Sequence, residues 1–150
     1  MVQDRISLLF LPAFVRVAAV VVAKLAGLLG LFLGSLVIGL LYGDSLWIAL
    51  GNSFASAAGI FCAYWVLCTA MRTESLPMTL PILVVLTALY SPINAMLHAF
   101  AWQWLGLSSG ITALEISLMM AGDIFGVIAM FFLIQLVSRA IKKLARRAEV

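Results

Sequence analysis

Five polar side chains that could bind a ligand or one another lie inside otherwise apolar stretches of this sequence. They are Arg16, Asn52, Asn94, His98 and Asp123. Asn94 and His98 belong to a longer series with Thr87 and Ser91, at spacings i, i+4, i+7 and i+11, which share one face of a helix. A charged group in apolar surroundings is costly unless it is paired. The pattern therefore indicates either a binding site or an internal polar contact between helices.

The composition of the surrounding chain is that of a membrane protein. Of the 150 residues, 65% are hydrophobic and only 10% are charged, and the mean hydropathy is +1.21. A soluble domain is about 45–50% apolar and about 25% charged. A chain of this size could not bury so much apolar surface in a soluble globule. The composition excludes a soluble catalytic domain, a nucleotide-binding sheet and a nucleic-acid-binding fold.

Apolar runs long enough to cross a bilayer predict the elements that position the polar residues. A crossing helix needs about 20 residues. Five runs qualify, and Gly, Ser and charged residues separate them: Ile6–Ala23, Leu25–Tyr42, Leu46–Ala70, Met78–Leu105 and Leu114–Val137. We expect an all-α fold, a polytopic integral membrane bundle of about five transmembrane helices. Residues 1–137 would form the transmembrane domain and residues 138–150 a basic cytoplasmic helical tail.

The distribution of basic residues predicts the orientation of the chain. Five of the nine Lys and Arg residues lie in the last twelve positions, and basic segments stay in the cytoplasm. With five crossings, Lys24 and Arg72 would also lie inside, and the N-terminus would be periplasmic. The predicted localisation is therefore the bacterial inner membrane, with several crossings and a cytoplasmic C-terminus.

The five polar residues should lie at similar depths in the membrane. From the outer end of each run, Asn52 lies at roughly 9 Å, His98 at 10–12 Å, Asp123 at 13 Å, Arg16 at 15 Å and Asn94 at 17 Å, for a rise of ~1.5 Å per residue. They would line a small cavity in the outer half, with Arg16 and Asp123 as opposite charges that pair directly or through Asn94 or His98. The alternative is a purely structural cluster that fixes helix register. The sequence predicts no catalytic residue, metal site or cofactor.

The C-terminal segment has the pattern of an amphipathic helix. Apolar and basic residues alternate at near-helical spacing in Ser138–Val150. This segment is either an anchor for the inner interface or a docking surface for a partner. The docking residues would be Ile141, Leu144, Lys142, Lys143, Arg146 and Arg147. The partners predicted are the lipid bilayer and another membrane or cytoplasmic protein, with no nucleic acid, and self-association of the chain is left open.

Four short segments, taken in order, resemble a bacterial family. They are Leu11-Pro12-Ala13 followed by Val15-Arg16-Val17, Gly30-Leu31-Phe32-Leu33-Gly34-Ser35, Ala49-Leu50-Gly51-Asn52-Ser53 and Gly122-Asp123-Ile124-Phe125-Gly126. Together they are similar to the membrane-associated sensor (MASE) domain of the first described type. The resemblance covers roughly residues 11–136. It implies an inner-membrane sensory module, in which Arg16, Asn52 and Asp123 occupy family-matching positions.

The chain departs from that family in two ways. The usual domain is longer, with further spans, and it normally precedes an output domain such as a cyclase or a kinase. From the resemblance we expect a non-enzymatic sensor or regulatory subunit that acts through a partner protein. Two alternatives remain open: a small-solute-binding or transport subunit, and a structural or assembly subunit of a membrane complex.

Overall fold

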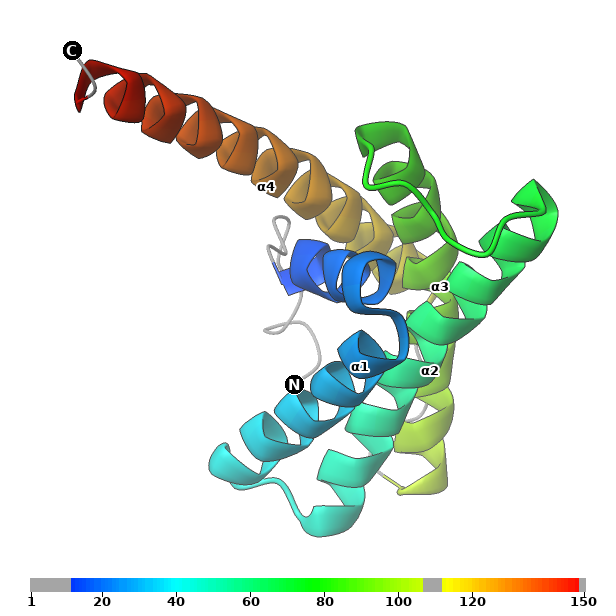
Figure 1. Cartoon of the computed structure of the whole chain (residues 1–150). Helices are drawn as coiled ribbons and strands as arrows, with labels where there is room; N and C mark the ends of the chain where they lie inside the picture. The colour runs from blue at the N-terminus through cyan, green and yellow to red at the C-terminus, as the bar shows by residue number, and fades with distance from the viewer. Residues whose placement is uncertain (1–11, 107–111, 149–150) are drawn as a thin grey trace.

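The fold was analysed in a computed structural model, which describes residues 12–106 and 112–148. All regular structure in these ranges is helical, as predicted (Figure 1). The four helices are α1 (Pro12–Leu41), α2 (Leu46–Met71), α3 (Leu80–Trp104) and α4 (Ala113–Ala148). Each contains a stretch long and apolar enough to cross a membrane. The chain is therefore a multi-pass membrane bundle.

The prediction of five crossing helices is wrong for the described residues, which contain four. The first two predicted runs both fall on α1, which changes direction at Lys24 (φ 49°, ψ −119°) (Figure 1). The break is where the sequence predicted it, but the residues on its two sides belong to one kinked helix, which supplies one of the four candidate spans. The predicted N-out, C-in arrangement was derived from five crossings.

Close backbone approaches hold the helices together. A Cβ added to Gly27 would clash with the carbonyl oxygen of Ala19, so the two segments of α1 are in contact across the kink. A Cβ on Gly59 of α2 would lie 3.1 Å from Cα of Asn94 on α3. Small residues allow such approaches where lipid supplies no hydrophobic drive for association. Asn94 is therefore fixed at the closest point between α2 and α3.

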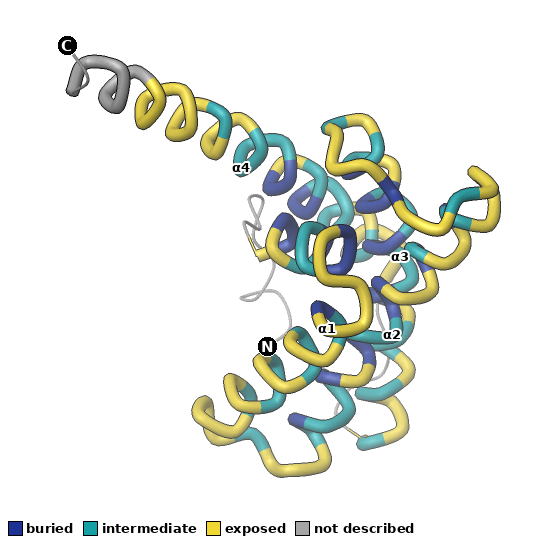
Figure 2. Tube along the Cα trace, viewed as in Figure 1, coloured by how far each residue is buried: buried dark blue, intermediate teal, exposed yellow. Residues whose placement is uncertain are grey.

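Burial divides the bundle into a packed interior and an apolar surface. The interior includes Val17, Ile60, Leu83, Leu86 and Tyr90, which are almost fully buried. Large apolar side chains on the outer faces are exposed in all four helices (Figure 2). In water such a surface would promote aggregation, whereas in a bilayer it is covered by lipid. The exposed aromatic residues Tyr42, Trp47 and Trp104 lie at the ends of the helices, the placement typical of a membrane interface.

Helix α4 continues past the bundle. It runs without a break through residue 137 to Ala148, which confirms the predicted helical extension. In Figure 1 its C-terminal half points away from the other three helices. Ile141 is 60% exposed and Lys142 is exposed as well. The side chains of Lys143, Leu144, Arg146 and Arg147 lie outside the described residues.

Candidate functional site

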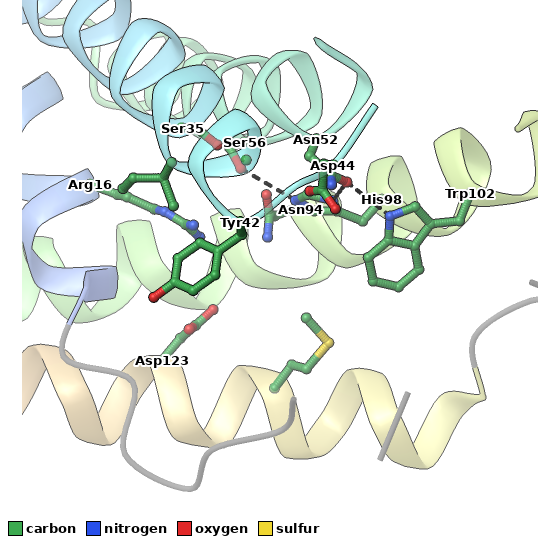
Figure 3. Close-up of a pocket in the computed structure, with 13 residues that line it drawn as sticks. Arg16, Ser35, Tyr42, Asp44, Asn52, Ser56, Asn94, His98, Trp102 and Asp123 are labelled. Atoms are coloured by element: carbon green, nitrogen blue, oxygen red, sulfur yellow. Dashed lines mark hydrogen bonds between the residues drawn. The ribbon is translucent and has the colours of Figure 1, made fainter. Parts of the chain in front are cut away.

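All four helices contribute to one polar cavity of about 560 Å³. Its lining comprises Arg16, Ser35, Ile38, Gly39, Tyr42, Asp44, Asn52, Ser56, Asn94, His98, Trp102, Met119 and Asp123 (Figure 3). All five residues that the sequence singled out are among them. Ligand pockets in proteins are typically about 300–1,000 Å³. The cavity therefore has the size of a site for a small molecule.

The cavity lies toward the end of the bundle that carries the α1–α2 and α3–α4 connections. Asn52 is six residues from the start of α2, and His98 is six residues from the end of α3. Asn94 is ten residues from the end of α3, and Asp123 is ten residues from the start of α4. At ~1.5 Å per residue, the polar layer spans roughly 9–15 Å below the connections. Asn52, Asn94, His98 and Asp123 therefore lie at similar distances from the same end of the bundle.

A hydrogen-bonded group joins α2 to α3 on one wall. The indole Nε1–H of Trp102 donates to Oδ1 of Asn52 at 2.9 Å. Since an indole N–H can only donate, this contact fixes which way the Asn52 amide faces. Nδ1 of His98 lies 3.2 Å from the same oxygen and must therefore carry its hydrogen. Nε2 is then an acceptor, and the Ser56 hydroxyl donates to it across 3.3 Å.

These contacts give His98 a structural position. Both of its ring nitrogens have partners, and its ring lies 5.5 Å, centroid to centroid, from the Trp102 ring. A histidine whose two nitrogens are engaged in this way holds two helices in register. Its polar atoms are already used by α2, so the site's free hydrogen-bonding capacity lies elsewhere.

A second polar contact joins α1, α3 and α4 at the deep end. Nη1 of Arg16 donates to the Tyr90 hydroxyl at 2.8 Å. The next residue of α3, Ser91, donates to Oδ2 of Asp123 at 2.5 Å. Arg16 and Asp123, which carry opposite charges, thus bond to two successive residues of α3. We predicted that Arg16 pairs with Asp123 directly or through Asn94 or His98; the structure gives Arg16 a bond to Tyr90 and Asp123 a bond from Ser91, and the pairing itself stays a prediction.

One buried polar atom of the lining has no hydrogen-bond partner among the described residues. It is Oδ1 of Asn94, whose residue is only 4% exposed. In Figure 3 the Asn94 side chain projects into the middle of the cavity. A buried acceptor without a donor costs about 1–3 kcal/mol. An occupant of the cavity that carries an N–H or O–H group would remove that cost.

Sequence reasoning missed the lining residues Trp102 and Asp44, and it missed Tyr90, the bonding partner of Arg16. Trp102 continues the stripe of Asn94 and His98 by four residues, so periodicity could have found it. Tyr90 lies beside Ser91 but reads as an ordinary core aromatic. In the sequence Asp44 looks like an ordinary loop residue. In the structure the turn between α1 and α2 folds back on α1, and the Asp44 N–H donates to the Gly39 carbonyl at 3.0 Å.

Comparison with known proteins adds no identification. Neither a protein-family model, nor a curated protein, nor a solved structure matches this chain. The resemblance to the membrane-associated sensor domain therefore stays a prediction. The described residues also contain no group of three His, Cys, Asp or Glu side chains that could hold a metal ion.

Proposed function

We propose that this protein is a non-enzymatic receptor in a bacterial inner membrane, which binds a small polar molecule and acts on a partner protein. The observation that carries the proposal is the unpartnered Oδ1 of Asn94 inside a cavity of about 560 Å³. The cavity has the volume of a ligand site. This buried amide oxygen lacks the donor that a ligand would bring.

Helix α4 supplies a physical route from the cavity to a partner. Asp123 of α4 lines the cavity and accepts a hydrogen bond from α3. The same helix continues to Ala148, where its exposed side chains include Ile141 and Lys142. A ligand that changed the position of Asp123 would move one end of a rigid helix whose other end is available for contact. This route favours a regulatory role.

The orientation in the membrane follows from charge. Four crossings place the α2–α3 loop with Arg72 on the same side as the basic end of α4. The α1–α2 connection on the opposite side carries Asp44. The positive-inside rule then assigns the C-terminal end to the cytoplasm and the mouth of the cavity to the outside. The receptor would sample molecules outside the inner membrane.

The proposal predicts that the cavity is open to water-soluble molecules. Ser35 lines it, whereas Ser53 is fully buried and bonds the carbonyl of Ala49 within its own helix. In a Cys62→Ala/Cys68→Ala background, Ser35→Cys should react with iodoacetamide, and the matched control Ser53→Cys should not. An unreactive thiol at position 35 in folded protein would contradict the proposal.

The role of the tail needs its own test. Ile141→Ser with Leu144→Ser should abolish recruitment of the partner, whereas exchanging Lys and Arg at positions 142, 143, 146 and 147 should not. Membrane insertion should be unchanged in both variants. If every co-purifying protein is retained by the double Ser variant, the tail is only an anchor.

A second candidate function rests on the satisfied wall of the cavity. Asn52, Ser56, His98 and Trp102 bond one another, as expected of a polar contact that fixes helix register in a structural subunit. This alternative predicts a closed interior. The iodoacetamide experiment separates the two, because a structural cluster would leave the thiol at position 35 unmodified.

A further inference from the structure

The chemistry of the lining narrows the class of molecule that the cavity could hold. Its charged side chains are two carboxylates, on Asp44 and Asp123, and one guanidinium, on Arg16. Arg16 and Asp123 bond adjacent residues of α3, Tyr90 and Ser91, at the deep end of the cavity. The described lining therefore has one carboxylate more than it has permanently charged cations, and Asp44 is the carboxylate farther from the deep end.

Asp44 is held where it can contact an occupant. Its backbone N–H donates to the carbonyl of Gly39, which turns the connection back against α1. A Cβ added to Gly39 would lie 3.4 Å from Oδ2 of Asp44, so the carboxylate packs against α1. Figure 3 shows Asp44 and Asn94 both directed into the cavity. A ligand there would meet a carboxylate and an unpartnered amide oxygen, and both accept hydrogen bonds.

Several of the remaining lining residues present apolar or aromatic carbon atoms to the cavity. The N–H of Trp102 is used by Asn52, which leaves its ring carbons for a ligand. Ile38 and Met119 are apolar, and Tyr42 adds a second aromatic side chain. Aromatic rings near a carboxylate are typical surroundings for a cation. An anion would instead face two carboxylates against a single guanidinium.

We infer that the cavity selects a small organic amine in its ammonium form, whose N–H groups donate to the Asp44 carboxylate and to Oδ1 of Asn94. This inference rests on the proposed function, because it assumes that the cavity admits a small molecule. It adds the charge and the donor groups of that molecule. The apolar part of the amine would lie along Ile38, Trp102 and Met119.

Protection of a thiol in the cavity tests the inference. The protein is Ser35→Cys in the Cys62→Ala/Cys68→Ala background, and iodoacetamide is the reagent. The four probes are butylammonium, butyltrimethylammonium, butyrate and butanol at equal concentrations. Butylammonium should slow the modification by about tenfold or more, since one ion pair between the aqueous and intermediate dielectric limits favours binding by at least that order, and the other probes should slow it by much less. Asp44→Asn should remove this protection, whereas Glu74→Gln, which removes a carboxylate in the exposed α2–α3 loop, should leave it unchanged.

Each outcome has a distinct meaning. Equal protection by butyltrimethylammonium, which has no N–H group, would overturn the role of Asn94 as an acceptor for the ligand. Protection by butyrate or butanol equal to that by butylammonium, or no protection by any probe, would overturn the selection of a cation while leaving an open cavity in place. A thiol that never reacts with iodoacetamide would instead contradict the proposed function. Asn94→Leu gives an independent check, since it should weaken butylammonium protection even where Asp44 is retained.

Discussion

The two halves of the bundle are built differently. Near the α2–α3 loop, α1, α2 and α3 pack through apolar side chains such as Val20, Ala63, Leu67, Leu76 and Leu83, all buried. Toward the α1–α2 connection the same helices meet around polar side chains and a cavity. An apolar contact between helices needs only complementary shape, whereas a polar one needs a partner for every buried group. The difference indicates that the first half is a scaffold and the second half is where selectivity for a ligand could arise.

The largest expected effect is on the charges at the deep end of the polar half. Asp123→Asn should lower the free energy of unfolding by about 3–5 kcal/mol, because Arg16 loses its counter-charge in a desolvated site. SDS titration of the purified protein in mixed micelles measures this. Glu74→Gln, in the exposed loop at the other end, is the control and should change it by less than about 0.5 kcal/mol. A similar loss in both variants would mean that Asp123 is not a buried counter-charge.

A cavity made in the scaffold half should be almost as costly. Leu83 is fully buried, and Leu83→Ala should lower the free energy of unfolding by about 2–5 kcal/mol. Leu29→Ala, at a 56% exposed position, is the matched control and should have little effect. Unlike Asp44→Asn, Leu83→Ala should leave butylammonium protection at position 35 intact wherever the protein is folded. Loss of protection in folded Leu83→Ala protein would show that packing in the scaffold half also determines binding in the polar half.

The contact between α2 and α3 should not tolerate a larger residue at Gly59. A Cβ there would lie 3.1–3.3 Å from backbone and Cβ atoms of Asn94, so Gly59→Val should cost about 1–3 kcal/mol of unfolding free energy. Gly30→Val is the comparison, because nothing lies within 4 Å of an added Cβ. Equal stability of the two variants in the SDS titration would contradict the close approach that positions Asn94.

The smallest effect concerns the kink of α1. Lys24 has a positive φ, which residues with a Cβ atom rarely adopt. Lys24→Gly should therefore raise the free energy of unfolding by about 1 kcal/mol. Leu25→Gly, one position into the following helix, should lower it by a similar amount. If Lys24→Gly were destabilising, the direction change in α1 would not be at this residue.

The sequence predicts the helices well because their breaks are chemically marked. Ser45 caps α2, with its hydroxyl accepting from the N–H of Ile48, and Arg72 ends the same helix in a left-handed conformation. The number of crossings was harder to predict, since hydropathy reports that Ile6–Tyr42 is apolar but not that the residues on both sides of Lys24 belong to one kinked helix. Composition alone cannot distinguish a kinked helix from two spans.

The site was predictable to the extent that polar residues in apolar runs are rare. Depth along each helix brought Arg16, Asn52, Asn94, His98 and Asp123 together without any knowledge of tertiary contacts. What could not be predicted were the bonding partners, because they depend on how the helices rotate about their axes. Tyr90 accepts from Arg16 only because α3 turns that face toward α1.

The central claim is that the polar half encloses a cavity open to the outside, while α4 carries its effect to the cytoplasm. Labelling of intact spheroplasts with a membrane-impermeant maleimide tests it most directly, with Ser35→Cys and Lys142→Cys in the Cys62→Ala/Cys68→Ala background. The thiol at position 35 should be labelled in intact spheroplasts, and the thiol at position 142 only after the membrane is permeabilised. Labelling at position 142 in intact spheroplasts, or at position 35 only after permeabilisation or not at all, would contradict the account.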